Sequence, residues 1–414
     1  MQTDNQKYFS TYDRKKSVYD RNGFSRIKIR SYNSITEIDK RFWDGLTNDI
    51  FNSWDFLLCL EKARVENSRM KYLVFYNNSM PVAIAVLSMF SISLDLLSGQ
   101  FTSNICNIVR KFFPGFMKVK FLFCGTPKKK KKNNLQIIDE SKKNQILNLL
   151  VKEMEVIAKD YEINILSFKE FNSNYCKSLA LLPYKNFIKA PSIPYVYLHI
   201  NQDWNSFDDY LKSMRHTFRR QINKSLNKLQ LDNRFSPSSE LINRKDLPVI
   251  KVVMPQVSDA LNFYEQYIEV MKRAKNKMEI LNKDFFENIF NYLKANSSLI
   301  QVVFDNKVIG SAVICQKDKV MTFLLVGLDY SMNKKFDVYF NIVYRIISLA
   351  IENKCTVLEM GQTSYYLKQR CGGKCEEMFF YIKARNKTIN YLLSLFKPLL
   401  FPQINVDELN VFRV

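Results

Sequence analysis

The chain has 414 residues, of which 47% are hydrophobic and 14% aromatic. These values exclude a disordered protein, and the length favours two domains of similar size. Lysine and arginine number 62 against 40 acidic residues, which gives a formal net charge of +22. Such a balance favours polyanionic partners, namely RNA, an acidic carrier protein or an anionic membrane surface. The alternative is that the lysines only form a solvated surface and bind no partner.

The cysteines and histidines argue against a metal protein. Eight cysteines form no CxxC pair, and there are only two histidines, so no four-ligand zinc site is expected. Most of the cysteines lie in apolar runs, which predicts reduced, buried thiols and a cytoplasmic protein. No signal peptide pattern is visible, and the most apolar run, 81–94, is shorter than the ~20 residues that a spanning helix needs.

The first half of the chain predicts a compact α/β unit. We expect a flexible extension over 1–25 and a first domain over 26–203, made of these elements: a strand at 26–30, helices capped by Ser34 and Ser53, a hairpin over 70–91 that turns at 77–79, a strand at 119–124, a helix at 146–158, and strands at 163–168 and 193–200. Residues 101–113 are a weaker candidate for a helix. The five lysines at 128–132 predict a mobile loop, or alternatively a loop that grips phosphates.

The second half repeats this plan, so we interpret the chain as a duplicated α/β unit. We expect a second domain over 204–388, made of these elements: a basic helix at 206–228, a strand at 250–254, helices at 258–272 and 282–293, a hairpin over 299–315, a strand at 320–328 and a helix at 337–353. An apolar C-terminal segment follows over 389–414 and leaves contact with a membrane surface open.

The stretch 355–385 contains the main candidates for a functional site. It predicts a buried strand at 355–360, a turn at Gly361, a polar and aromatic loop that ends in Lys368, a break at Gly372 and Gly373, and a second strand from Met378. This arrangement is typical of polar groups placed beside a cleft. A hairpin-like surface connection is the alternative.

Taken in order, these segments resemble the GNAT-type acyltransferase domain of Fem-like proteins of peptidoglycan biosynthesis. The similar phrases are FDDYLKSMRHTFRRQINK, the FCGTP turn at 123–127, LPYKNF with PSIPYVYL, and the late GQTSYYLK segment with its double glycine. The resemblance covers roughly 25–385. It implies two tandem GNAT-like domains with mixed central sheets flanked by helices, and transfer of an acyl or aminoacyl group to an amine.

The resemblance also implies where the donor and the working groups lie. Gly361, Gln362, Tyr366, Lys368 and Gly373 match the late cleft segment, while Arg215 and Arg219 match the basic helix. One departure concerns the donor. The place of the glycine-rich pyrophosphate loop of GNAT enzymes reads DYSMNKKFDVYF here, with no glycine, so free acyl-CoA is in doubt. Acyl carrier protein and aminoacyl-tRNA are the other donors, and Fem relatives take the acyl group from aminoacyl-tRNA. The resemblance implies no tightly bound cofactor, and a small molecule or a cell-wall precursor supplies the acceptor amine.

Acyl transfer needs a deprotonated amine, a polarised carbonyl and close contact between them. We predict that Lys368 stabilises developing oxyanion charge or a donor phosphate, with a surface lysine as the alternative. Glu359 is the candidate base or a salt-bridge partner, and Tyr366 positions the acceptor or packs in the core. Lys334 and Lys335 are candidates for holding a phosphate at the N-terminus of the next helix, although Asp337 at that position argues against it. The competing hypothesis is a non-catalytic protein that binds RNA or an anionic membrane on the same scaffold.

Overall fold

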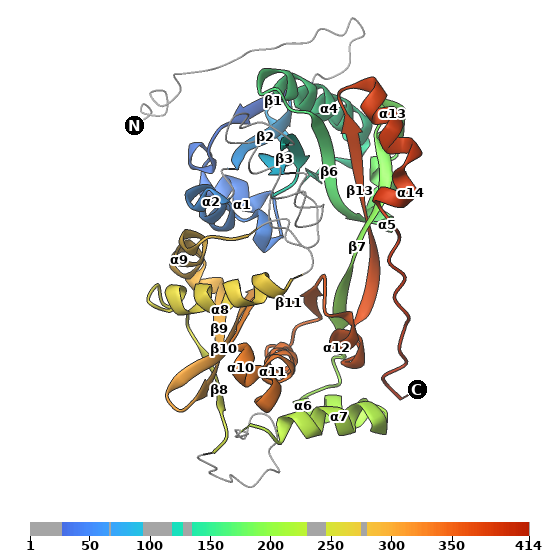
Figure 1. Cartoon of the computed structure of the whole chain (residues 1–414). Coiled ribbons are helices and arrows are strands. Elements are labelled where there is room, and N and C mark those ends of the chain that lie inside the picture. Colours follow the sequence, from blue (N-terminus) through green and yellow to red (C-terminus); the bar gives the residue numbers. More distant parts are fainter. Residues whose placement is uncertain are drawn as a thin grey trace, which may run out of the picture.

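The computed structural model describes residues 27–65, 68–93, 118–126, 135–229, 246–274 and 280–413. The predicted N-terminal extension, the helix expected near 101–113 and the lysines at 128–132 lie outside these ranges. The fold is α/β, with helices on a 13-stranded mixed sheet that runs through both halves (Figure 1). The predicted fold class is confirmed, and the two central sheets are joined into one.

Most predicted elements of the first half are present. They are β1 (Ile27–Tyr32), α1 (Lys40–Gly45), α2 (Trp54–Ala63), β2 (Arg69–Asn77), β3 (Met80–Ser93), β4 (Lys118–Cys124), β5 (Leu135–Ile137), α4 (Lys143–Asp160), β6 (Ile165–Asn172), α5 (Ser173–Cys176) and β7 (Ile188–His199). Ser53 caps α2 as predicted. The single helix expected from Ser34 is wrong: Ser34 caps only a 3-10 turn, and Asp39 then caps α1.

The second half follows the same order of strands and major helices. They are α6 (Phe207–Ser213), α7 (His216–Leu226), β8 (Val249–Val253), α8 (Asp259–Arg273), α9 (Lys283–Tyr292), β9 (Ser297–Phe304), β10 (Lys307–Lys317), β11 (Val320–Leu328), α10 (Tyr330–Phe336), α11 (Val338–Glu352), β12 (Val357–Gly361), α12 (Tyr365–Arg370), β13 (Lys374–Ala384), α13 (Lys387–Leu395) and α14 (Lys397–Leu400). The helices α6, α7, α10, α13 and α14 are additional to that order. Within the described ranges, no helix combines the length and hydropathy needed to cross a bilayer.

The two halves exchange a strand with each other. The strand order is β1-β2-β3-β4-β6-β13-β7-β12-β11-β10-β9-β8, with β5 paired to β3. Thus β7, the last strand of the first half, pairs with β12 of the second, and β13 from the end of the second half pairs with β6 of the first. The strands β7 and β13 also pair with each other, which closes the junction. Tyr381 of β13 is part of the first half's core, and Val196 of β7 is part of the second half's core.

A third hydrophobic core lies between the halves. It unites α1 and α2 with α8 and α9, and its largest fully buried side chains include Trp43, Phe56 and Tyr267. Figure 1 shows these four helices together on one side of the sheet. Because this core draws on both halves, the halves are packed together as firmly as each is packed within itself.

The end of the chain returns to the second half. After α14, the chain runs without helix or strand past β13 and β7 to the region of α6 (Figure 1). There Met214 forms a β-bridge with Phe412, and the Arg215 amide donates to the Val411 carbonyl at 2.9 Å. The predicted single helix over 206–228 is therefore wrong. It is divided into α6 and α7 because Met214 is extended, with φ −80° and ψ 151°, where the tail pairs with it.

Candidate functional site

The strands β11 and β12 diverge after a short parallel pairing. Their pairs run from Val320 and Val357 to Thr322 and Glu359, whereas β11 continues to Leu328. Beyond Thr322, the side of β11 that faces β12 has no strand partner among the described strands.

The loop that follows β12 has an unusual backbone. Gly361, Thr363 and Ser364 have φ angles of 83°, 113° and 54°, respectively. Glycine adopts positive φ at little cost, but each non-glycine residue there costs of order 1–3 kcal/mol and persists only when its surroundings hold it. The surroundings here are β7 and α11. The Gln362 amide donates to the Ile193 carbonyl at 3.0 Å.

Two tyrosines hold the same loop. The Tyr365 hydroxyl donates to the Pro194 carbonyl of β7 at 3.0 Å. Burial raises the pKa of Tyr339, in the first turn of α11, to about 12, and a hydrogen bond with Ser364 opposes part of this shift. The loop is thereby fixed between β7 and the N-terminus of α11, on the side where β12 separates from β11.

Lys368 lies on a helix, not in the predicted loop. Residues 365–370 form α12, and Lys368 is only 3% exposed, so its alternative as a surface lysine is wrong. Among the described residues, no hydrogen bond or ion pair reaches its ammonium nitrogen. Burial lowers the pKa of Lys368 from 10.5 to about 7, and Cys375 on β13 opposes part of this shift. A desolvated lysine that exchanges a proton near neutral pH is typical of an active site.

The double glycine allows the chain to turn tightly from α12 into β13, close to β7. The Gly373 amide donates to the Lys368 carbonyl at 2.9 Å, and a Cβ at Gly373 would lie 2.7 Å from that oxygen and 2.8 Å from Cγ1 of Val196. Gly372 has φ +82°, and a Cβ there would collide with the ring of Phe412 in the tail. These two positions therefore require glycine, and the close packing that they allow determines how near Lys368 lies to β7.

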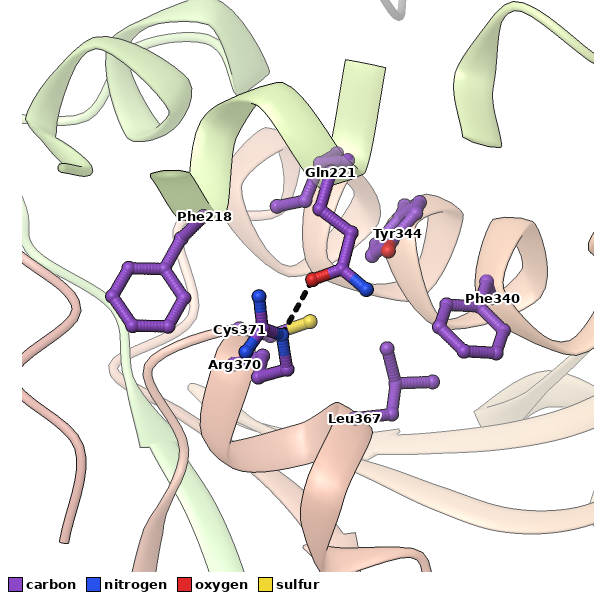
Figure 2. Close-up of a pocket in the computed structure, with 8 residues that line it drawn as sticks. Phe218, Gln221, Phe340, Tyr344, Leu367, Arg370 and Cys371 are labelled. Atoms are coloured by element: carbon purple, nitrogen blue, oxygen red, sulfur yellow. Dashed lines mark hydrogen bonds between the residues drawn. The ribbon is translucent and has the colours of Figure 1, made fainter. Parts of the chain in front are cut away.

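The helix α7 docks on α12 through Arg370. Figure 2 shows the Arg370 guanidinium reaching the Gln221 side chain, to whose oxygen it donates at 2.5 Å. The same guanidinium lies over the rings of Phe218, at 5.1 Å, and Tyr366, at 5.2 Å. Tyr366 itself is 64% exposed, so it does not pack in the core and remains accessible to a ligand.

The remaining cations surround this site at a distance from Lys368. Arg215 is exposed just before α7, and Arg219 is half-buried one turn later. Lys334 and Lys335 are exposed at the end of α10, where Lys335 lies 4.8 Å from the ring of Phe336. They form a basic perimeter, not a second cluster around Lys368.

The N-terminus of α11 already has an acidic partner. Asp337 precedes the helix with φ 49°, and its carboxylate pairs with Lys228 at 3.0 Å and accepts from the Ser225 hydroxyl at 2.9 Å. Any phosphate bound at this helix end would meet that carboxylate. The helix α10 moreover occupies the place where the sequence lacks the phosphate-loop glycines.

Glu359 faces away from Lys368. Its neighbours on β12, Leu358 and Met360, are part of the core to which α12 contributes Leu367, so alternation directs Glu359 to the opposite face of the sheet. There it is 4% exposed, and it accepts a hydrogen bond from the Thr322 hydroxyl at 3.1 Å. Burial, followed by the charge of Glu359, raises the pKa of Tyr195.

Several residues that shape the site were not found from the sequence. Arg370 lies in the stretch 355–385. Its charge, four residues after Tyr366, could have indicated that it belongs to the site. Ser364 and Tyr339 meet only because β12 and α11 fold together, and Phe412 reaches the site from the far end of the chain. Within the described residues, no group of histidine, cysteine or acidic side chains is arranged to hold a metal ion.

The comparisons with known structures show the fold class. FemX superimposes with a TM-score of 0.56 at 11% identity, over 88% of this chain and 100% of that one. A tandem GNAT protein from the clavulanic acid biosynthesis pathway gives a TM-score of 0.50 at 7% identity, over 87% and 99% of the two chains. The molecule is thus a tandem GNAT-like protein.

The sequence comparisons name its family. The FemAB-like family, described as peptidoglycan biosynthesis/recognition, matches residues 34–373. The chain belongs to this family, as its motifs predicted. It is also 22% identical over 329 residues to a putative 8-amino-7-oxononanoate synthase 2 of Mycobacterium tuberculosis, in two strains. The matched region is 77% of this chain, and the chain spans 40% of the length of that relative.

Proposed function

We propose that this protein transfers an acyl or aminoacyl group from an activated donor to an amine. The observation that carries the proposal is the buried Lys368 on α12, the helix that follows β12, with no hydrogen bond or ion pair to its ammonium nitrogen from the described residues. Burying a lysine without such a partner destabilises a protein, and groups that carry this cost are concentrated at sites of chemistry. Membership of the FemAB-like family and the tandem GNAT-like fold agree with it.

The reaction needs few groups from the protein. The amine nitrogen attacks the donor carbonyl carbon and a C–N bond forms; the bond from that carbon to the carrier's oxygen or sulfur then breaks, and the carrier leaves with the electron pair. The amine gives up a proton, which ends on the departing oxygen or sulfur of the carrier, and the carbonyl oxygen gains negative charge in the transition state. Protonated Lys368 would stabilise that charge. Glu359 is assigned no proton transfer, because it faces the other side of β12.

The donor in this proposal is a carrier macromolecule. Free coenzyme A would need a phosphate site before α11, but α10 and the carboxylate of Asp337 occupy that place. The exposed Arg215, Lys334 and Lys335, with the half-buried Arg219, suit a polyanion such as tRNA or an acidic carrier protein. The family description favours an amine of a cell-wall precursor as the acceptor.

A donor comparison tests the proposal. The purified protein is incubated with acyl-CoA, acyl carrier protein loaded with an acyl group, or aminoacyl-tRNA, each with an amine-bearing cell-wall precursor. We expect amide formation with a carrier macromolecule, a weaker rate at high salt, and loss of turnover in Lys368→Ala. Tight, salt-independent binding of free acyl-CoA would contradict the donor assignment, and full turnover in Lys368→Ala would remove Lys368 from the site.

The second candidate is a non-catalytic protein that binds RNA or an anionic membrane. It is favoured by the exposed basic side chains of α7 and by the exposed apolar side chains of α13. The two candidates differ in one respect. A binder would retain its affinity for the polyanion after Lys368→Ala and form no amide with any donor, because a buried lysine contributes little to a surface contact.

A further inference from the structure

The apolar face of α13 and α14 points outward. Neither helix has a buried residue. The exposed fractions of their large apolar side chains range from 44% to 79%, in Ile389, Tyr391, Leu392, Leu395, Phe396, Leu399 and Leu400. We call this set the C-terminal apolar face. A contiguous run of such side chains on a folded protein marks a contact surface.

Polar contacts fix this orientation. The Asn390 side-chain oxygen accepts from the Ala384 amide at 2.9 Å, and its amide donates to the Asn186 carbonyl at 3.1 Å. The ring of Phe401, just beyond α14, packs on Phe380 of β13 at 5.0 Å between centroids. Asn390 and the half-buried Leu393 thus face the protein, whereas most of the apolar side chains face away from it, unlike those of an ordinary surface helix. The helices cannot roll over and bury their leucines without losing these bonds.

The segment that carries the C-terminal apolar face has only basic charges of its own, although Lys383 pairs with Glu155 of α4. From Met378 to Val406 the sequence contains no acidic residue, while it contains Lys383, Arg385, Lys387 and Lys397. Lys387 is exposed at the start of α13. Tyr184, which is 84% exposed, lies close to the loop residue Asn186 that α13 binds. Leucine and phenylalanine with flanking lysines and exposed tyrosines form the composition that anionic lipid headgroups attract.

A second copy of the chain fits this surface less well. A symmetric contact through the C-terminal apolar face would bring Lys387 and Lys397 of both copies together, with no acidic residue of the segment to compensate. We therefore propose that α13 and α14 dock the protein on an anionic lipid bilayer, lying in the plane of the headgroups with their leucines in the acyl boundary. In Figure 1 they lie at the end of the molecule away from α7, so docking leaves the basic perimeter of the site free.

Vesicle flotation of the full chain tests this surface. Phosphatidylcholine vesicles are compared with vesicles that also contain phosphatidylglycerol. We expect the protein to float with the anionic vesicles and to remain in solution with the neutral ones. The double variant Leu395→Gln with Leu399→Gln should lower partitioning about tenfold or more, since each substitution removes an exposed apolar side chain from the lipid. Lys387→Glu with Lys397→Glu should remove the preference for anionic lipid.

A control keeps the result specific. Met80, the first residue of β3, is 71% exposed and lies outside the C-terminal apolar face, so Met80→Gln should float like the unaltered protein. No flotation with anionic vesicles, or equal flotation of the double leucine variant, would overturn the proposal. Sedimentation that shows a dimer, lost in the same leucine variant, would assign the surface to a second copy instead. None of these outcomes depends on turnover, so the proposed transferase activity stands or falls separately.

Discussion

The same strand pair ends differently in the two halves. In the first half, β4 stops at Cys124, which is still paired with Phe168 of β6. In the second half, β11 continues well past its last partner on β12. The short helix that follows each pair differs too. Lys177, directly after α5, is exposed, whereas Lys368 within α12 is buried. One duplicated plan therefore has a strand that extends beyond its parallel partner and a desolvated lysine in one copy, and neither in the described part of the other.

The largest expected effect is a difference in kcat between variants of these two lysines. Lys368→Ala should lower kcat by about 100-fold or more, because a preorganised cation aimed at developing charge is worth that much. Lys177→Ala should change kcat less than about twofold, because an exposed lysine is replaced by water. Turnover with the donor that supports transfer is the measurement. Equal losses in the two variants would mean that both halves take part in the reaction.

The second prediction concerns stability and its dependence on pH. The unfolded chain binds a proton at this lysine up to pH 10.5, but the folded chain releases it near pH 7, so burial destabilises the protein most below pH 7. Lys368→Met should therefore raise the free energy of unfolding by about 2–4 kcal/mol at pH 6. The gain should shrink as the pH rises from 7 towards 10.5.

Urea unfolding at pH 6, 8 and 10 measures this gain. Lys177→Met is the matched control and should show no such trend, since its side chain is solvated in both states. A gain that stays constant with pH would show that Lys368 binds its proton equally in the folded and unfolded chains, as a solvated or ion-paired lysine does.

The third prediction tests the close packing under α12. Gly373→Ala should destabilise the protein by about 1–3 kcal/mol, because its Cβ would collide with backbone at Lys368. Gly45→Ala is the control, since no atom lies within 4 Å of a Cβ at Gly45. Its free energy of unfolding should change by less than about 0.5 kcal/mol. Similar values for the two variants in urea unfolding would mean that α12 shifts freely on β13.

The smallest expected effect is a difference in KM between variants of two tyrosines. Tyr366→Ala on α12 should raise KM about threefold and leave stability unchanged within about 0.5 kcal/mol, because the ring is exposed. Tyr175 on α5 stacks on Phe171 and donates to the Leu135 carbonyl at 2.6 Å. Tyr175→Ala should cost about 2 kcal/mol of stability and leave KM unchanged. Steady-state kinetics with thermal unfolding checks both variants, and an unchanged KM for Tyr366→Ala would exclude it from ligand binding.

Local patterns predicted the fold well where the cause was local. The caps at Ser53 and Asn282, the hairpin turns and the order of strands and helices all follow from nearby residues. They failed where a distant segment decides the outcome. The division of 206–228 into two helices depends on contacts with Val411 and Phe412. Nothing in the sequence around Met214 predicts this division.

The candidate site was predicted in part. Glycine, glutamine, tyrosine and lysine in one stretch marked the region, but the burial of Lys368 and the turn of Glu359 to the other face depend on how β7, β12 and β13 pair. A loop was expected where α12 forms, because the helix is short and follows two residues with positive φ that only tertiary contacts hold.

The exchange of β7 and β13 has a consequence for how the protein is made. One edge of β6 pairs with β13, which ends at Ala384, so this edge stays bare until the second half has been synthesised. Nascent chains with a bare edge of this kind are prone to aggregate and to seek other strands. If the two halves are expressed from separate genes, each product should lack one strand of its sheet and tend to aggregate. Co-expression of both halves should restore solubility.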